Sequence, residues 1–460
     1  MTDADIGTRG EDRAYEIDGT VIERILEALD SRDREALLLA LQPLHPADIA
    51  DILEQIDPRD RPRLLELWGS AFDGGVLAEV DEGVLPDLID DLPPPILENA
   101  IRDLETDDVV DIIEDVEESQ QEQVLDALDD PEREAVIQSL AYPEDSAARL
   151  MQRELVKAPT HWTVGHAIDH LRGSEDLPDR FYDVVIVDPK IRPVGKVPLS
   201  RLMSTPRDVA LVDLMDEDFR SIPVTQNQAD VAYAFNQYHM VSAPVVDGNG
   251  RLLGVVTIDD AMDVLESEAD DDIRRLAGVG EDESLTDSVA ATTRQRFPWL
   301  AVNLATSILA SIVIAQFAGT IEAIVALAVL MPIVASMGGN AGTQTLTVAV
   351  RALATKDLTP ANVWRVIRRE TFVGVLNGIV FAVITGLVGL VWYGSPVLGA
   401  VLGMAMIGNL FVAGLAGIFI PLGLDRLGLD PAVASGAFVT TVTDVVGFFS
   451  FLALAALILL

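Results

Sequence analysis

Asp444 lies in the middle of the last apolar segment of the chain. It is the only acidic residue near the centre of any apolar segment long enough to cross a membrane. A carboxylate at bilayer depth is costly, so it must face protein, water or a counter-ion. Because the same segment contains no Lys, Arg or His, the residue predicts a mobile cation as its partner, and with it an ion path. The neighbouring Thr440 and Thr441 are candidate linings of that path, unless their hydroxyls bond to their own helix.

A glycine-rich interruption of an earlier apolar segment is the second candidate feature. The segment from Ile321 to Val348 contains Pro332 and then the run Gly338-Gly339-Asn340-Ala341-Gly342-Thr343-Gln344. We expect this run to break the helix, and a membrane tolerates such a break only where it is buried or lines a wet cavity. The candidate pore-lining or neck residues are therefore Gly338, Gly339, Asn340 and Gln344. The two amides serve equally well as caps for freed backbone groups.

Acidic side chains outside the apolar segments form a third group of candidates. Asp107 and Asp111 are four residues apart, so both project from one face of a helix. A divalent cation between such carboxylates would relieve their repulsion, since oxygen ligands suit hard cations. A solvated helix face explains the same pattern without a metal. A second acidic run, which leads toward the first apolar segment, contains Asp260, Asp263, Glu268 and Asp271.

The composition divides the chain in two. The net charge of −42 comes almost wholly from the first 295 residues, because six acidic residues face seven basic ones from Arg296 onward. An acidic surface repels nucleic acid, so we expect no nucleic-acid partner. The acidity is equally typical of adaptation to a saline cytoplasm. No cysteine is present, which excludes disulfides and thiolate metal sites. Neither a His-Glu-x-x-His motif nor a second central membrane carboxylate supports a protease, and we expect no enzyme.

Five apolar segments are long enough to cross a bilayer. They run from Trp299 to Phe317, Ile321 to Val348, Phe372 to Trp392, Val397 to Leu424 and Ala432 to Leu459. The loop from Arg351 to Arg369 is rich in basic residues, whereas the loops near 318–320 and 393–396 have none. The chain also begins without a signal peptide pattern. We therefore expect a multi-pass protein of the cell (inner) membrane, with a cytoplasmic N-terminus and an external C-terminus. Asn377 and Asn409 are predicted to form hydrogen bonds between membrane helices.

The polar half of the chain contains two kinds of module. Residues 20–140 repeat a short helical phrase, as in Leu44–Leu53, Leu85–Leu92 and Asp107–Ile113, which predicts a helical superhelix. From Met151 short β runs alternate with helices, in two units about 60 residues apart that resemble a pair of CBS repeats. The second unit contains Gly254-x-x-Thr257-x-x-Asp260, a pattern with which such repeats hold a ribose. Its resemblance makes ATP or another adenosine nucleotide a candidate ligand, and a structural pair without nucleotide is the alternative.

We therefore expect a multidomain chain with a cytosolic all-α helical superhelix, an α/β pair of CBS repeats and an all-α transmembrane domain of five helices. The expected boundaries are 1–19 for a flexible N-terminus, 20–140 for the helical N domain, 141–212 and 213–268 for the CBS repeats, 269–296 for an acidic linker (plug) helix and 297–460 for the transmembrane domain.

Four motifs accompany this order of domains. They are Tyr142-Pro143-Glu144-Asp145-Ser146-Ala147, Thr257-Ile258-Asp259-Asp260, the glycine-rich run with Arg351-Ala352-Leu353-Ala354, and Thr441-x-Thr443-Asp444-Val445-x-Gly447. Together, the domain order and the motifs resemble the MgtE family of magnesium channels. The resemblance covers residues 20–460. The chain departs from relatives at Ala437, at Thr343 and in the loop Thr225-Gln226-Asn227-Gln228.

The resemblance implies a homodimer in the lipid bilayer, a magnesium-selective pore and closure by cytosolic magnesium. It implies that Asp444 holds the pore ion. It also implies that regulatory magnesium ions bind at Asp107, Asp111, Asp260, Asp263, Glu268 and Asp271. Transport of manganese, cobalt or zinc remains an alternative, as does a membrane-anchored CBS sensor that transports nothing.

Overall fold

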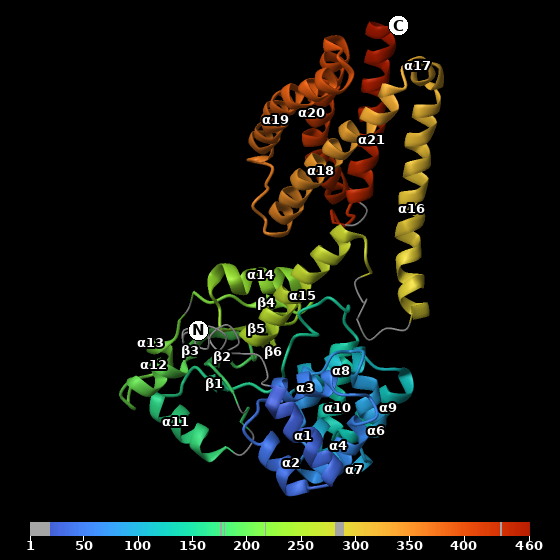
Figure 1. Ribbon diagram of the computed structural model, residues 1–460. Coiled ribbons are helices and arrows are strands. Elements are labelled where there is room, and N and C mark those ends of the chain that lie inside the picture. The colour runs from blue at the N-terminus through green and yellow to red at the C-terminus, as the bar shows by residue number, and fades with distance from the viewer. Residues whose placement is uncertain (1–18, 175–176, 179, 217, 281–288, 433–434) are drawn as a thin grey trace, which may run out of the picture. The chain divides into compact units, whose positions relative to one another are not determined.

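The computed structural model describes residues 19–460 except 175–176, 179, 217, 281–288 and 433–434 (Figure 1). The chain divides into two compact units between Glu266 and Ser267. The expected flexible N-terminus lies outside the described residues, apart from Gly19.

The first part of the chain is an array of short amphipathic helices, as their periodic apolar residues predict. Leu37, Ile52, Leu64 and Leu88 are fully buried in a core to which these helices contribute. The helices are α1 (Gly19–Ser31), α2 (Arg34–Leu41), α3 (Pro46–Gln55), α4 (Arg61–Trp68), α5 (Gly75–Glu79), α6 (Leu85–Asp91), α7 (Pro94–Arg102), α8 (Thr106–Glu114), α9 (Glu118–Ala127) and α10 (Asp130–Leu140). A 3₁₀ turn, η1 (Gly69–Ala71), follows α4.

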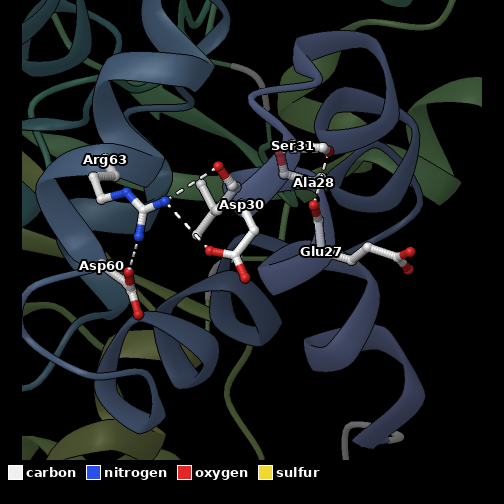
Figure 2. A network of polar contacts seen from close by, with 7 residues as sticks. Glu27, Ala28, Asp30, Ser31, Asp60 and Arg63 are labelled. Carbon is white, nitrogen blue, oxygen red and sulfur yellow. Dashed lines mark hydrogen bonds and ion pairs between the residues drawn. The ribbon is translucent and has the colours of Figure 1, made fainter.

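Arginine side chains join these acidic helices. Figure 2 shows Arg63 of α4 reaching the end of α1, where its guanidinium lies 3.4 Å from an Asp30 carboxylate oxygen and donates to the Leu29 carbonyl at 3.3 Å. The same guanidinium is 2.6 Å from Asp60. Such half-exposed pairs contribute little individually, about 1 kcal/mol or less. They offset part of the repulsion that the acidic composition creates.

Two similar α/β units follow, which confirms the predicted pair of CBS repeats. In each unit a parallel pair of strands is extended by an antiparallel third strand, and the register shifts at the same place, after Ile186 and after Val245. The strands are β1 (Lys157–Pro159), β2 (Asp183–Val187) and β3 (Pro193–Pro198) in the first sheet, and β4 (Ile222–Pro223), β5 (Ser242–Val246) and β6 (Leu252–Thr257) in the second. The helices are α11 (Val164–Gly173), α12 (Leu199–Ser204), α13 (Leu211–Leu214), α14 (Gln228–Tyr238) and α15 (Ile258–Ala277).

Helix α15 continues without interruption past the boundary that we expected at 268–269. Its first turns belong to the second CBS repeat, where Ala261 and Val264 enter the core. Its last turn packs in the second unit, where Leu276 contacts a cluster that includes Leu346 and Val439. The expected linker helix therefore shares one helix with the second CBS repeat, and its residues 281–288 lie outside the described part of the chain.

The described residues include five helices that are long and apolar enough to cross a membrane, as predicted. They are α16 (Val289–Ala315), α18 (Ala326–Ala354), α19 (Val363–Tyr393), α20 (Pro396–Arg426) and α21 (Ser435–Leu459), and a short helix α17 (Ala318–Ala323) precedes α18. Helix α20 lies at the centre, with Leu402, Ala405 and Met406 fully buried. It packs against α18, α19 and α21 (Figure 1).

Helices α19 and α20 form a hairpin in which backbone lies against backbone. A Cβ atom on Gly399 would stand 2.4 Å from the Gly386 carbonyl oxygen, and one on Gly389 would stand 2.9 Å from the Gly399 Cα. The turn between the helices uses Gly394 at φ +64°. Small residues permit this close approach in a membrane.

The predicted break in the second span is wrong. Helix α18 is continuous from Ala326 to Ala354, through Pro332 and through the whole run 338–344. The chain breaks earlier, at Ile324 and Val325, between α17 and α18. The glycines of the run allow neighbouring helices to approach: a Cβ atom on Gly342 would meet Val439 of α21 at 2.5 Å, and one on Gly417 of α20 would meet the Gly342 carbonyl oxygen at 2.8 Å.

Candidate ion pathway and cytosolic carboxylates

One face of the middle of α18 carries a line of polar side chains in the second unit, Ser267–Leu460, which we call the membrane unit. The exposed members follow helical spacing, namely Ser336, Asn340, Thr343, Gln344 and Thr347. Polar side chains in a spanning helix usually face protein or water rather than lipid. This line is the part of α18 on which an ion pathway can be built.

Asp444 contributes the carboxylate of this region from α21. Its side chain is half-buried, and it has no hydrogen-bond or ion-pair partner among the described residues. Thr440, one turn earlier, lies close to α18, because a Cβ atom on Gly339 would stand 3.9 Å from its methyl carbon. Two of the predicted neck residues, Gly339 and Thr440, are therefore brought together.

The threonine hydroxyls of α21 donate to their own helix. Thr440 Oγ1 donates to the Gly436 carbonyl at 2.9 Å, and Thr441 Oγ1 donates to the Ala437 carbonyl. The buried Thr443 Oγ1 donates to the Val439 carbonyl at 3.1 Å. Each hydroxyl keeps lone pairs, so an oxygen of Thr440 or Thr441 remains able to accept a hydrogen bond from the water shell of an ion.

Gly338 and Gly342 do not face the same way as Asn340 and Gln344. Both glycines are buried, with Gly338 against the side chain of Asn409 and Gly342 against Val439. Asn340 and Gln344 are exposed instead. The glycine-rich run therefore has a packing face and a polar face, separated by helical spacing.

The cytosolic carboxylates gather where α8 meets the start of α15, within the first unit. Asp107 is buried with 3% of its surface exposed, and its pKa lies well above the ordinary value because of burial and the nearby Asp260. Burial also raises the pKa of Glu105 to about 7, with Asp108 and Glu154 adding to the shift. The same cause raises the pKa of Asp108 and of Asp260 to about 6 each. These groups repel one another as anions.

Asp111 and Asp263 extend this cluster toward solvent. Desolvation raises the pKa of both, reinforced by Glu114 and Asp260 at Asp111 and by Glu79 at Asp263. Both side chains remain exposed, so water screens their neighbours, and the buried Asp107 is the stronger case of electrostatic conflict. Among the residues that the structure describes, no group of three His, Asp or Glu side chains has the geometry of a preformed metal site.

Two predicted regulatory residues, Glu268 and Asp271, lie in the second unit, away from this cluster along α15. Arg275 pairs with Asp271 at 3.2 Å and with Asp430, after α20, at 2.7 Å. Arg275 and Asp430 were not identified from the sequence. The i,i+4 spacing of Asp271 and Arg275 is visible there, but the contact across 155 residues is not.

The motif Gly254-x-x-Thr257-x-x-Asp260 has a local structural role. The Asp260 carboxylate accepts hydrogen bonds from the Thr257 backbone N–H at 3.2 Å and from its hydroxyl at 2.8 Å, which caps the start of α15. A Cβ atom on Gly254 would collide with Met151 Cγ at 2.2 Å, so the space beside this glycine is already filled.

A cavity of about 720 Å³ lies elsewhere in the CBS pair. Lys196, Arg220 and Tyr238 are among its lining residues, whereas Gly254, Thr257 and Asp260 are not. Lys196 Nζ donates to Asp183 at 2.7 Å, and the Arg220 guanidinium lies 3.6 Å above the Tyr238 ring. Part of the lining, residues 196 and 198–200, comes from the first-repeat segment Gly195–Arg201, in which Pro198 and Arg201 replace the Thr and Asp of the motif.

Comparison with known proteins adds to this geometry. Residues 44–145 match the MgtE intracellular N domain, residues 211–267 match the CBS domain, and residues 331–454 match the divalent cation transporter family named MgtE. The chain is 35% identical over 318 residues to the magnesium transporter MgtE of Thermus thermophilus, an alignment that covers 68% of this chain and 70% of that one. The chain belongs to the MgtE family.

A second sequence relative and a solved structure give the same result. The magnesium transporter MgtE of Enterococcus faecalis is 37% identical over 300 residues, which cover 65% of this chain and 66% of that relative. The crystal structure of the cytosolic domain of the Mg²⁺ channel MgtE in complex with ATP has a TM-score of 0.50 at 28% identity, and covers 53% of this chain and 99% of that structure. The alignments thus span about two thirds of the sequence relatives. These relatives are named as transporters or a channel, a class distinct from enzymes.

The site residues that could not be identified from the sequence are mainly those whose role depends on a tertiary contact. Gln152 Nε2 donates to the Glu105 carboxylate at 2.7 Å, and the Glu154 carboxylate accepts from the Thr106 hydroxyl at 2.7 Å. These contacts join the N domain to the segment before β1. The spacing of Ser336 and Thr347 with Asn340 and Gln344 was available in the sequence as a helical period and could have been found.

Proposed function

We propose that this chain transports magnesium across the cell membrane as a homodimeric channel. In this proposal Asp444 is the ion-binding carboxylate of a pore lined by α18 and α21. One observation carries it: a single carboxylate on α21 lies in a membrane unit beside a helix with a continuous polar face. The naming of the relatives as magnesium transporters supports the choice of ion.

The exposure of the α18 polar face supports the homodimer. In one chain alone, Asn340 and Gln344 are exposed over a helix that is long enough to span the bilayer. Lipid cannot satisfy these amides, whereas a second copy facing them would enclose a polar path between the two chains. Each copy would supply one Asp444.

A single carboxylate per chain suits a hydrated magnesium ion. Magnesium gives up its water reluctantly and is usually bound through one or two carboxylates with several waters retained. Neutral oxygens of Thr440 and Thr441 can accept hydrogen bonds from that water. Conduction needs an ion that binds and leaves, and such a site binds less tightly than a cage of protein ligands.

We also propose that the cytosolic carboxylates sense internal magnesium and favour the closed pore. Asp107, Asp111 and Asp260 would share bound cations, with Asp263 and Glu268 further along α15. A bound cation supplies positive charge that replaces protons and relieves the repulsion among these buried anions. Their raised pKa values support this, because each carboxylate is kept neutral only by a proton when no cation is present.

The orientation that fits this scheme has a cytoplasmic N-terminus and an external C-terminus. Five spans place the two ends on opposite sides. The end of α18, the turn after it and the start of α19 contain Arg351, Lys356, Arg365, Arg368 and Arg369, and in this arrangement they lie on the cytoplasmic side with the N-terminus.

For an adenosine nucleotide, we propose the 720 Å³ cavity rather than the motif at Gly254. The cavity has the size of a small-molecule site and presents Lys196 and Arg220 for phosphates and Tyr238 for stacking. The related cytosolic domain was crystallised in complex with ATP. Titration of the protein with ATP, with Lys196→Met and Thr257→Val compared, separates the two locations: only the former should weaken binding.

The proposal is tested with purified protein in liposomes. Magnesium flux is measured for the wild type and for Asp444→Ala while internal magnesium is varied. We expect flux through the wild type that falls as internal magnesium rises, and none through Asp444→Ala. Flux that survives Asp444→Ala would refute the pore assignment, and preferred flux of manganese, cobalt or zinc would replace the ion. A wild type without any flux would favour the anchored sensor.

A further inference from the structure

A buried asparagine connects the three central helices of the membrane unit. Asn409 of α20 is fully buried, and its Nδ2 donates to the Val334 carbonyl of α18 at 2.8 Å, the interhelical bond that its type predicts. Its Oδ1 is buried and has no hydrogen-bond partner among the described residues. An unpaired acceptor in a membrane interior is costly, and an apolar side chain at this position would avoid that cost.

Glycines on the two neighbouring helices make room for this amide. A Cβ atom on Gly338 of α18 would stand 2.1 Å from Asn409 Nδ2, and one on Gly447 of α21 would stand 2.7 Å from the same atom. The amide therefore lies between α18 and α21, in direct contact with the glycine backbone of each helix. Gly447 follows Asp444 by three residues, which places both on adjacent turns of α21.

We propose that Asn409 is a positioning residue that sets the separation of α18 and α21 beside Asp444, and that it thereby determines which divalent cations pass. The inference rests on the proposed function and deepens it.

Asn409 itself need not touch the ion. It acts through Gly447, whose contact fixes how far the turn that carries Asp444 can approach α18.

The physical reason lies in the shape and directionality of the amide. An apolar side chain of similar volume fills space without fixing an orientation, whereas the hydrogen bond to Val334 holds the amide plane in one position between two glycines. Protein interiors are close-packed, so a change of one methyl group at this contact must move a helix. The spacing of two helices around a hydrated ion is then controlled by one side chain.

The experiment uses the full-length protein in liposomes, with magnesium and manganese uptake measured for each variant at equal amounts of folded protein. The variants are Asn409→Leu, Asn409→Ala, Gly447→Ala and the double variant Asn409→Ala/Gly447→Ala. The matched control is Gly408→Ala, because a Cβ atom there meets nothing within 4 Å. Asp444→Ala is measured in parallel to test the proposed function itself.

We expect Asn409→Leu and Gly447→Ala to change the magnesium-to-manganese uptake ratio by about tenfold, which corresponds to ~1.4 kcal/mol. Gly408→Ala should keep the wild-type ratio. In the double variant the added methyl group occupies the space left by the amide, so its effect should be smaller than that of Gly447→Ala alone. A merely structural role would lower the yield of folded protein without changing the ratio.

The inference is overturned if all Asn409 and Gly447 variants retain the wild-type ratio while Asp444→Ala abolishes uptake. If Asp444→Ala leaves uptake intact, the pore assignment fails instead, which is a separate result. If Asn409→Leu does not fold, the uptake ratio of Gly447→Ala and its recovery in the double variant Asn409→Ala/Gly447→Ala still distinguish a positioning role of Asn409 from a purely structural one.

Discussion

The two groups of carboxylates in this protein differ in number and in surroundings. In the first unit several carboxylates converge on Asp107 and Asp260, and burial with mutual repulsion raises their pKa values. In the membrane unit Asp444 stands alone among neutral oxygens. The crowded group gains greatly from a cation and is suited to hold one and change shape. The solitary group gains little, so it is suited to let an ion leave.

The largest expected effect is at the solitary group. Asp444→Asn keeps the shape of the side chain and removes its charge, so magnesium flux in liposomes should fall to the level of protein-free vesicles. Asp425→Asn, which removes an exposed carboxylate near the end of α20, is the matched control and should conduct as the wild type does. If Asp444→Asn conducts normally, charge at this position is not what attracts the ion.

The crowded group should affect regulation rather than conduction. Asp107→Asn combined with Asp111→Asn should leave flux at low internal magnesium unchanged. It should raise the internal magnesium concentration needed for half-inhibition by about tenfold or more, because each lost anion removes a ligand. Glu118→Gln with Glu122→Gln on α9 has the same spacing on an acidic helix and should have no effect. If magnesium inhibits the two double variants equally, Asp107 and Asp111 do not bind regulatory magnesium and belong to a solvated helix face.

Among the proposed regulatory residues, Asp263→Asn combined with Asp271→Asn should also preserve magnesium flux at high internal magnesium. The contact of Asp271 with Arg275 adds a distinction between the two. Asp263→Asn alone should account for most of the effect, since Asp271 already has a cationic partner. Unchanged inhibition of the double variant would remove both residues from the sensor.

Low pH should weaken inhibition by internal magnesium through the proposed sensor carboxylates. The pKa of Glu105 is raised to about 7 and that of Asp260 to about 6, so protons occupy these groups at pH 6 and must leave before magnesium binds. Apparent magnesium affinity of inhibition should therefore increase roughly tenfold from pH 6 to pH 8. Flux assays at fixed internal magnesium across this range measure the shift.

The same carboxyl groups predict the opposite trend for stability without metal. Their folded pKa values exceed the unfolded values near 4, so the protons that they retain stabilise the fold fully below about pH 4. That stability is lost as the pH rises through about 6 and 7. Thermal unfolding in a chelator should thus show a falling midpoint over this range, and magnesium should restore it. A midpoint that does not change with pH would show that folding does not raise the pKa values of these carboxyl groups.

The smallest effect is expected at Arg275. Arg275→Gln removes the pair with Asp430, a contact that is only partly buried and therefore contributes ~1 kcal/mol or less. Half-inhibition by magnesium should shift upward by about two- to fivefold. Arg365→Gln, an exposed arginine near the start of α19, should leave it unchanged. A downward shift would mean that the pair holds the pore open.

Much of the architecture could be predicted because it follows from periodicity and length. Apolar runs of about 20 residues gave five spans, and the alternation of β runs with helices gave the CBS pair. The break at 338–344 was predicted wrongly, because glycine was interpreted as a local breaker. In α18 its role is set by neighbouring helices, which approach Gly338 and Gly342 closely and keep the helix intact.

The candidate site could be predicted only in part, for a similar reason. A lone charge such as Asp444 stands out in any sequence, and the i,i+4 spacing of Asp107 and Asp111 is local. The approach of Asp260 to Asp107, and of Arg275 to Asp430, joins segments about 150 residues apart. The capping role of Thr257 and Asp260 was available from their spacing, as an N-cap and a third helical residue.

The glycine contacts between α19 and α20 have a mechanical consequence. Side chains can repack when two helices slide, but Gly386 and Gly399 bring main chain directly against main chain and leave nothing to rearrange. We therefore expect the hairpin to move as one rigid body. If the proposed channel opens, the movement would be taken up at the other contacts of α20, where Asn409 meets Val334 and Gly447.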